Sequence, residues 1–355
     1  MNHVKKIPST NNSHYQDIVS NITRDVFAHP RDLSRFYVEK YGVSRVTATK
    51  NIRRLEAEGW IARSGPSTHP VFSAGYKRRI SHLYELSGLE EHAVWETDFE
   101  PFFLLKPNIK AIAQHGFTEM VNNTIDHSEG KRVFVWMSQL DKYLSIIVSD
   151  DGVGIFRKIS DALRLPDMRQ ALFELSKGKF TTDPSNHSGE GVFFTSRAFE
   201  QFQIEANGLH FEHKSGDMDA LVEKTNMDFG EGTSVWMVIP INSDRTLNDV
   251  YAEYTKAPDD FDFSKTIVPM KLAQFGGELV SRSQAKRLIA RFDRFKLVIL
   301  NFEGVSEVGQ AFADELFRVY ARANPGVELL PQNMSEQVER MWRRAIGTTQ
   351  GQGKV

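Results

Sequence analysis

The sequence predicts a multidomain α/β protein, and three observations support this fold class. The chain has 355 residues, which is enough for two or three domains. Its N-terminal part has the pattern of short helices followed by a hairpin. Two further parts alternate helices with strands, and such alternation is typical of layered α/β folds. We therefore expect a helical head followed by two α/β domains.

Changes in this pattern mark the expected domain boundaries. The predicted segments are a disordered start (1–13), a head (14–75), a connector (76–106), a central domain (107–242), a linker (243–263), a C-terminal domain (264–346) and a disordered tail (347–355). The linker prediction rests on the polar stretch NSDRTLNDVYAEYTKAPDDFD.

The composition excludes several classes of protein. Hydrophobic residues make up 40% of the chain and charged residues 25%, which is ordinary for a globular protein. The absence of cysteine excludes disulfides, thiolate zinc sites and cysteine nucleophiles. The N-terminus lacks an apolar signal core, and no segment approaches the roughly 20 apolar residues needed to span a bilayer. We expect a cytoplasmic protein with no membrane partner.

Charge is distributed unevenly along the chain. Residues 1–80 contain 14 Lys or Arg and 6 Asp or Glu, a net charge of +8, whereas the whole chain carries −2. The remainder must therefore carry −10. A basic head on an acidic body suggests a partner specific to the head, with nucleic acid as the first candidate. A basic solvated surface is the alternative.

The head has the layout of a helix-turn-helix with a wing. We expect a first helix over about 31–40, and a second helix that Ser44 caps and Gly59 ends. Strand, Gly-Pro turn and strand follow in WIARSGPSTHPVFSAG. Helical spacing places three residues of the second helix toward the core, namely Ala48, Ile52 and Leu55.

The stretch GVSRVTATKNIRRLEAEGWI resembles the recognition helix and wing of winged-helix domains in bacterial regulators. The resemblance implies DNA binding and transcription regulation, with Arg63 touching the DNA backbone from the wing. It also implies that exposed side chains of the second helix reach base edges or phosphates in the major groove, namely Arg45, Thr49, Lys50 and Arg53. A winged helix used only for protein contact is the alternative.

A polar stripe interrupts the apolar helical pattern of TEMVNNTIDHS, residues 118–128. Glu119, Asn123 and His127 follow one another at intervals of four, so they share one helix face. A carboxylate can order or deprotonate a water, and an amide oxygen one turn away can bind Mg²⁺. A solvated surface would explain the stripe equally simply if it stood alone.

Three glycine-containing motifs follow this helix. An alternating apolar strand runs into DDGVG, where a buried carboxylate at Asp150 could accept a hydrogen bond from an exocyclic amine such as that of adenine. SGEGVFF then opens a helix, whose free N–H groups can hold phosphate. FGEGTSVWMVIP places Thr233 at the start of a strand. Each motif alone is more often just a turn, but their order is specific.

Together the four motifs resemble the ATP-binding domain of gyrase, heat-shock chaperones, histidine kinases and MutL, called the GHKL superfamily. The resemblance covers about 107–242 and implies a two-layer α/β sandwich, the Bergerat fold, with ATP and Mg²⁺ as ligands. It implies that Glu119 is the general base or water-positioning residue and that Asn123 binds Mg²⁺. The other implied ATP contacts are Asp150 at the adenine amine, Gly152 and Gly154 around the adenine, Gly189 and Gly191 at the phosphates, and Thr233 behind the adenine.

Further residues enter through the same resemblance. His127 falls where the anti-sigma-factor kinase branch also carries histidine, although a structural histidine is the alternative. Residues 155–188 would form a lid over the nucleotide, with Lys177 and Lys179 as phosphate contacts or else as surface lysines. Asp126 replaces the basic residue usual in histidine kinases, and no phospho-acceptor hairpin precedes the domain. These departures argue against autophosphorylation.

The stretch LVILNFEGVSEVGQAFADEL resembles STAS domains of anti-sigma-factor antagonists, and more closely a STAS-like domain of unknown function. STAS antagonists carry a phosphorylatable serine at the start of the helix, where this chain has Gln310, and Ser306 lies in the preceding loop. The resemblance therefore implies a module that docks a protein partner or forms a homodimer.

These observations lead to one interpretation and two rivals. We expect a bacterial regulator that binds ATP and DNA, in which Mg-ATP binding or slow hydrolysis controls the head and the STAS-like domain. A serine/threonine protein kinase of the anti-sigma type, acting on a separate protein, is the alternative. An interaction scaffold with a vestigial site is a third reading, against which the intact Glu119 and Asn123 pair argues.

Overall fold

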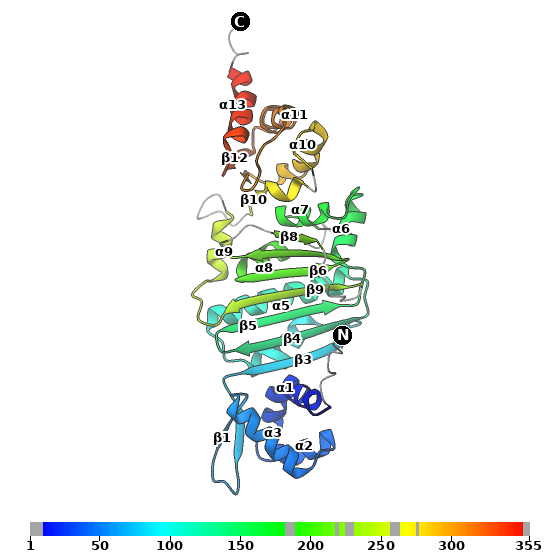
Figure 1. The fold of residues 1–355 in the computed structure, drawn as a ribbon, viewed down its shortest axis with the longest axis vertical. Helices are drawn as coiled ribbons and strands as arrows, with labels where there is room; N and C mark the ends of the chain where they lie inside the picture. Colours follow the sequence, from blue (N-terminus) through cyan, green and yellow to red (C-terminus); the bar gives the residue numbers. More distant parts are fainter. Residues whose placement is uncertain are drawn as a thin grey trace, which may run out of the picture. The chain divides into compact units, whose positions relative to one another are not determined.

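The computed structural model describes residues 10–181, 189–216, 220–223, 231–255, 263–274 and 277–350. It divides into two compact units, the first made of Met1–Asp151 with Val235–Asp244 and the second of Gly152–Ser234 with Arg245–Val355. Figure 1 shows the elements of each unit, coloured along the chain. In the described part of the chain, no helix is both long and apolar enough to cross a membrane.

The head, drawn in blue in Figure 1, contains three helices and a two-stranded antiparallel sheet. Ser44 caps α3 by accepting a hydrogen bond from the Thr47 N–H, as its position before the helix predicts. Ala48, Ile52 and Leu55 are buried, so the predicted core face of α3 is confirmed. The elements are α1 (Thr10–Ala28), α2 (Leu33–Tyr41), α3 (Arg45–Ala57), β1 (Ile61–Ser64) and β2 (Val71–Ala74).

Two predictions at the ends of the chain need correction. Helix α1 begins at Thr10, so residues 10–13 of the predicted disordered start are helical, and residues 1–9 lie outside the described residues. The last helix, α13 (Glu336–Gln350), includes residues 347–350 of the predicted disordered tail. In both cases the sequence pattern near the end was too polar to indicate a helix.

The predicted connector is in fact part of a sheet. Strand β3 (Arg78–Glu85) pairs antiparallel with β4 (Arg132–Leu140), which pairs antiparallel with β5 (Tyr143–Asp150). This strand lacks the alternating apolar pattern from which a strand is predicted. Ile80 is its one fully buried apolar residue, whereas Leu83 is 53% exposed. The rest of the connector forms α4 (Glu91–Val94), a π-helical turn (Trp95–Phe99) and a 3₁₀ turn (Glu100–Phe102).

Helix α5 (Pro107–His127) covers one face of β5 in the first unit (Figure 1). Alternate residues of β4 and β5 are buried, as period-two patterning predicts, and they are Val133, Val135, Met137, Leu144, Ile146 and Val148. The order of strands in the large sheet is β3-β4-β5-β9-β6-β7-β8, with β9 at Thr233–Pro240.

The second unit begins with α6 (Ile155–Leu163), α7 (Gln170–Lys177) and α8 (Gly191–Ala198). An antiparallel meander follows, made of β6 (Gln201–Ala206), β7 (Leu209–Lys214) and β8 (Ala220–Glu223). Residues 247–253 of the predicted linker form helix α9 (Leu247–Glu253), which starts with a capping box of Thr246 and Asp249. The linker looked polar, but Tyr251 packs its ring on Phe194.

The C-terminal part of the second unit is a three-stranded parallel sheet with helices, as the strand–helix alternation predicts. Its strands are β10 (Lys265–Pro269), β11 (Leu297–Asn301) and β12 (Glu328–Gln332). Helix α10 (Arg282–Leu288) connects the first two strands. Between β11 and β12 the chain forms α11 (Gln310–Asp314), a π-helical turn (Glu315–Tyr320) and α12 (Ala321–Ala323).

Candidate functional site

The polar stripe of α5 lies beside the buried face of the helix. Glu119, Asn123 and His127 are all half-buried. The neighbouring residues of the helix are buried, and they are Gly116, Phe117, Met120, Val121 and Thr124. The predicted common face is therefore present, at the border between the core and the surface. Such a position suits side chains that meet a ligand.

The amide of Asn123 stands out within this stripe. Its Nδ2 atom is buried and makes no hydrogen bond with any residue that the structure describes. Nearly all buried polar atoms have a partner, and leaving one unpaired costs about 1–3 kcal/mol. A half-turn of the amide exchanges its nitrogen for its oxygen, which Mg²⁺ prefers as a ligand. The unpaired amide therefore fits a site for a metal ion and its ligand.

The two aspartates at the end of β5 occupy different positions. The Asp151 carboxylate accepts hydrogen bonds from the Lys131 N–H (2.8 Å), the Arg132 N–H (2.9 Å) and the Arg132 Nε (3.1 Å). These bonds lower the pKa of Asp151 to about 2, so it clamps the start of β4. Asp150 instead continues the buried face of β5 and lies opposite Val133 in β4. Of the pair, Asp150 is the candidate ligand-binding residue.

The first glycine motif is held by two side chains of the second unit. Asn207 donates a hydrogen bond to the Val153 carbonyl (3.0 Å) and accepts one from the Arg157 N–H (3.1 Å). Gly154 has φ +85°, and a Cβ there would lie 2.4 Å from the Asn207 amide. Only glycine permits this close approach. Gly152 is buried in the same loop.

Thr233 fixes the other side of this loop. Its hydroxyl accepts a hydrogen bond from the Ile155 N–H (3.0 Å), at the first residue of α6. Any support that Thr233 lends to an adenine site would act through this loop. Asn207 was not predicted as a site residue, although the Asn-Gly pair at 207–208 is a hairpin signal. That signal indicates a turn and carries no information about a clamp on a distant loop.

The second glycine motif packs directly on backbone. Gly189 has φ +74°, and a Cβ there would lie 2.4 Å from the carbonyl group of Phe180. The Phe180 N–H donates a hydrogen bond to the Gly189 carbonyl (3.1 Å). Helix α8 begins at Gly191, and its N-cap residue Glu190 does not cap it through the side chain. The start of α8 therefore remains suited to an anion.

The structure corrects the prediction for the two lysines of the lid. Lys177 is fully buried, and its ammonium donates to the carbonyls of Leu288 (3.2 Å) and Ala290 (3.1 Å) in the C-terminal part. Lys179 donates to the Arg294 carbonyl (3.2 Å). Both ammonium groups thus donate to backbone carbonyls beyond β10. The segment that carries them is helical through α6 and α7, and residues 182–188 lie outside the described residues.

The predicted DNA-facing residues form an exposed surface on the head. Arg45, Lys50 and Arg53 are exposed on α3, together with Thr49, whose hydroxyl donates to the Arg45 carbonyl. The neighbouring Arg54 is different, because it pairs with Glu58 (2.8 Å) and covers the Tyr15 ring. Arg63 is exposed on β1. The assignment of the head as a winged helix stays a prediction.

Comparison with protein families decides the nature of the central domain. Residues 109–243 match the family described as histidine kinase-, DNA gyrase B-, and HSP90-like ATPase. The chain contains a GHKL ATPase domain. Residues 284–339 match a STAS-like domain of unknown function, so both predicted resemblances are confirmed. A search of curated proteins gives no match to the chain.

The GHKL domain is an ATP-binding domain. The first unit holds Glu119, Asn123, His127 and Asp150, and the second holds the two glycine motifs with Thr233. Among the described residues, no group of three or more His, Asp or Glu could hold a metal ion alone. Mg²⁺ usually keeps water and phosphate oxygens as ligands, so a single amide oxygen such as that of Asn123 can contribute to its site.

Proposed function

We propose that this protein is an ATP-controlled, DNA-binding regulator in which the GHKL domain binds Mg-ATP and the head binds DNA. Asn123 would hold Mg²⁺, Asp150 would recognise the adenine amine, and the two glycine motifs would enclose the nucleotide. Glu119 would position the attacking water or remove its proton. Bound Mg²⁺ would supply positive charge to the phosphates. The STAS-like domain would serve a protein partner or a second copy of the chain.

The proposed control of DNA binding by ATP rests on the junction between the head and the sheet. The Arg79 N–H of β3 donates to the Thr23 hydroxyl of α1 (2.8 Å), and Thr23 is fully buried. The Arg79 guanidinium lies over the rings of Trp60 (4.9 Å) and Trp136 (5.4 Å). The head is therefore packed directly onto β3, with no free linker between them.

A second contact strengthens this junction. The Arg24 guanidinium of α1 pairs with Asp98 (2.8 Å), and the Tyr84 hydroxyl of β3 donates to the same carboxylate (2.7 Å). Strand β3 pairs with β4 and β4 with β5, which ends at Asp150. A nucleotide-dependent shift of β5 would thus reach the head through two ladders of backbone hydrogen bonds.

The exposed face of α3 supports DNA as the partner of the head. Arg45, Lys50 and Arg53 form no ion pair with any residue that the structure describes. Three unneutralised cations on one helix face attract phosphate and release counterions when they bind it. The net charge of +8 over residues 1–80 has the same sign.

The test is to titrate labelled genomic fragments with the full-length protein, with and without Mg-ATP. We expect salt-dependent DNA binding whose affinity changes with nucleotide. Binding no stronger than that of a neutral control protein at the same salt would refute the DNA role. A DNA affinity that Mg-ATP does not change would refute the proposed control of DNA binding by the nucleotide.

Incubation with labelled ATP and Mg²⁺, with and without a bacterial lysate, separates the chemical outcomes. Released phosphate indicates an ATPase, and retained nucleotide without chemistry indicates a binding switch. A labelled protein indicates the protein kinase that is the rival function.

A further inference from the structure

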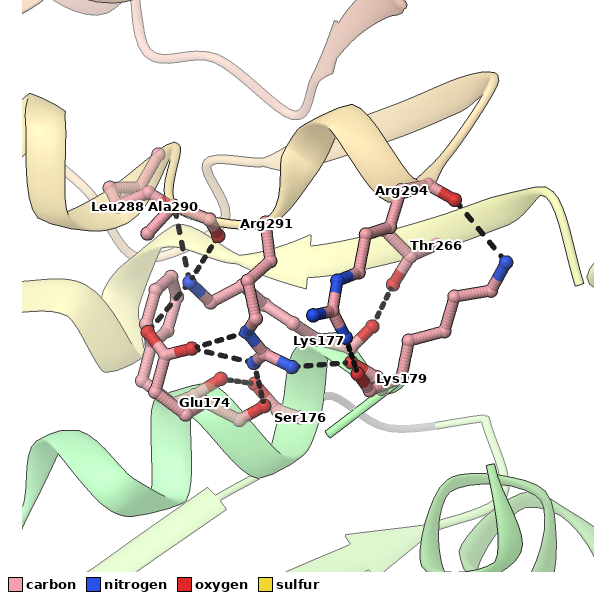
Figure 2. A network of polar contacts seen from close by, with 11 residues as sticks. Glu174, Ser176, Lys177, Lys179, Thr266, Leu288, Ala290, Arg291 and Arg294 are labelled. Carbon is pink, nitrogen blue, oxygen red and sulfur yellow. Dashed lines mark hydrogen bonds and ion pairs between the residues drawn. The ribbon is translucent and has the colours of Figure 1, made fainter. Parts of the chain in front are cut away.

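The end of helix α7 is held by side chains from the C-terminal part of the chain. Three consecutive backbone carbonyls of this segment each accept a hydrogen bond from that part (Figure 2). A helix leaves its last carbonyls without partners in the helix itself, so they need external donors. The donor–acceptor pairs are Thr266 with Lys177 (2.8 Å), Arg291 with Gly178 (3.1 Å) and Arg294 with Lys179 (2.8 Å).

Arg291 lies at the centre of this network. Its Nη2 donates to the Glu174 carbonyl (2.8 Å), its Nε donates to the Glu174 carboxylate (3.1 Å), and its Nη1 reaches Gly178. Its guanidinium also lies 5.3 Å from the centre of the Phe180 ring. The planar fork of arginine suits several acceptors at fixed angles, and a cation is favoured at a helix C-terminus. Arg291 therefore fixes both the position and the direction of this helix end.

Lys177, the last residue of α7, also connects this helix to the C-terminal part. Its ammonium pairs with Glu174 (2.7 Å) and donates to the carbonyls of Leu288, the last residue of α10, and of Ala290 just beyond it. Its charge is fully buried, so it depends on these partners. Removing one partner of such a buried network leaves an uncompensated charge, which is strongly unfavourable. The network thus favours one arrangement of α7 against the C-terminal part.

The end of the held segment contacts the second glycine motif. Phe180 follows Lys179 and donates its N–H to the Gly189 carbonyl. Gly189 packs on the Phe180 backbone so closely that a Cβ would collide with it. The backbone of Phe180 therefore constrains the position of Gly189, and α8 starts two residues later at Gly191.

We propose that Arg291, in the C-terminal part that contains the STAS-like domain, is a positioning residue for Gly189 and Gly191, the predicted phosphate contacts of the GHKL domain. The inference rests on the proposed ATP binding at this domain. Arg291 does not touch the nucleotide and acts through residues 177–180 and Gly189. Occupancy of the phosphate site and the packing of the C-terminal part on α7 are then coupled. Such coupling is reciprocal, so a partner that alters this packing would alter ATP affinity.

The test compares the affinities of full-length variants for Mg-ATP and for adenosine by calorimetry. Arg291→Gln should weaken Mg-ATP binding by about 5–150-fold, the usual range of coupling between sites. Its affinity for adenosine should be unchanged, because adenosine has no phosphates. Arg291→Lys should be intermediate, since lysine keeps the charge and loses the fork. Arg287→Gln is the matched control, because Arg287 is exposed four residues earlier.

Each outcome decides between the two proposals. Equal loss of ATP and adenosine affinity in Arg291→Gln, or no loss of either, would overturn the positioning role. No ATP binding by the unaltered protein would overturn the proposed function itself. Thr266→Val provides a second route if Arg291→Gln does not fold, because it removes only the hydroxyl that donates to Lys177. An unchanged ratio of ATP to adenosine affinity in a folded Thr266→Val protein would also overturn the inference.

Discussion

At the scale of single residues, neighbouring side chains with the same chemistry have separate tasks. Asp150 and Asp151 are adjacent carboxylates, yet Asp151 accepts three hydrogen bonds from Lys131 and Arg132. Arg53 and Arg54 differ in the same way, because only Arg54 is paired with Glu58. Residue type alone therefore does not identify a ligand-binding group, and the existing partners of the side chain must be known.

The aspartate pair offers a matched experiment. We expect Asp150→Asn to abolish recognition of the adenine amine, because the amide of asparagine can present a donor where the carboxylate accepts. Asp151→Asn should retain ATP affinity and lower the thermal midpoint, because the clamp on β4 is weakened. Calorimetry and thermal unfolding of both variants measure the two effects. Unchanged ATP affinity in Asp150→Asn would show that the adenine site is assigned wrongly.

Glu119 and Asn123 are expected to separate chemistry from binding. Glu119→Ala should keep nucleotide affinity and lose about 10²–10⁴-fold in any hydrolysis or phosphotransfer, the usual contribution of a positioned base. Asn123→Ala should lose the dependence of ATP affinity on Mg²⁺. Turnover with labelled ATP and calorimetry with and without Mg²⁺ give the two readouts. Equal turnover of Glu119→Ala and the unaltered protein would contradict the general-base role.

At the scale of elements, helix α7 shows how a buried charge links two parts of the second unit. Burial lowers the pKa of Lys177 from its ordinary 10.5 to about 8, although Glu174 acts in the opposite direction. Between these values the unfolded chain binds a proton that the folded protein does not. Stability contributed by this group is therefore complete above pH 10.5 and is lost as pH falls through about 8.

This linkage predicts a pH dependence that a variant can isolate. The free energy of unfolding of the unaltered protein, minus that of Lys177→Met, should rise between pH 7.5 and pH 9.5, a window around the folded pKa of about 8. Denaturant unfolding at the two pH values measures the difference. Lys286→Met is the control, because Lys286 is exposed on α10. A difference that is the same at both pH values would contradict the assignment of the buried ammonium.

Helix α3 carries the prediction for DNA. We expect Lys50→Gln or Arg53→Gln to weaken binding to all sequences and to reduce the salt slope by about one unit if the side chain contacts phosphate. A lost base contact should instead cost about 1–3 kcal/mol and relax sequence choice. Arg35→Gln is the control, because Arg35 is exposed on α2 and pairs with Asp32. Equal DNA affinity of all three variants and the unaltered protein would show that Lys50 and Arg53 of α3 do not contact DNA.

At the scale of the whole molecule, the chain joins a head, a GHKL ATPase domain and a STAS-like domain. The predicted connector is strand β3, and part of the predicted linker is helix α9. Direct packing favours communication between parts, because two packed elements cannot shift independently. The head is joined to the sheet within the first unit, and the C-terminal part to α7 within the second.

The head junction predicts a specific change in the control of DNA binding. Thr23→Val keeps the shape of the side chain and leaves the Arg79 N–H unpaired. We expect the factor by which Mg-ATP changes DNA affinity to shrink toward one in this variant. The effect of DNA on ATP affinity should shrink by the same factor, since linkage is reciprocal. Ser20→Ala on the outer side of α1 is the control, and an equal factor in both variants would contradict the route through β3.

Patterns within short stretches of sequence were sufficient to predict the four GHKL motifs, the STAS-like domain and the core face of α3. Each depends on residues a few positions apart, whose helical spacing or glycine content is set by local geometry. The tertiary structure alone decided the clamp of Asn207 on Arg157, the contact of Thr233 with Ile155 and the burial of Lys177 near Ala290. These pairs are 50, 78 and 113 residues apart in the chain. No local pattern encodes such pairings, because they form only when distant segments pack together.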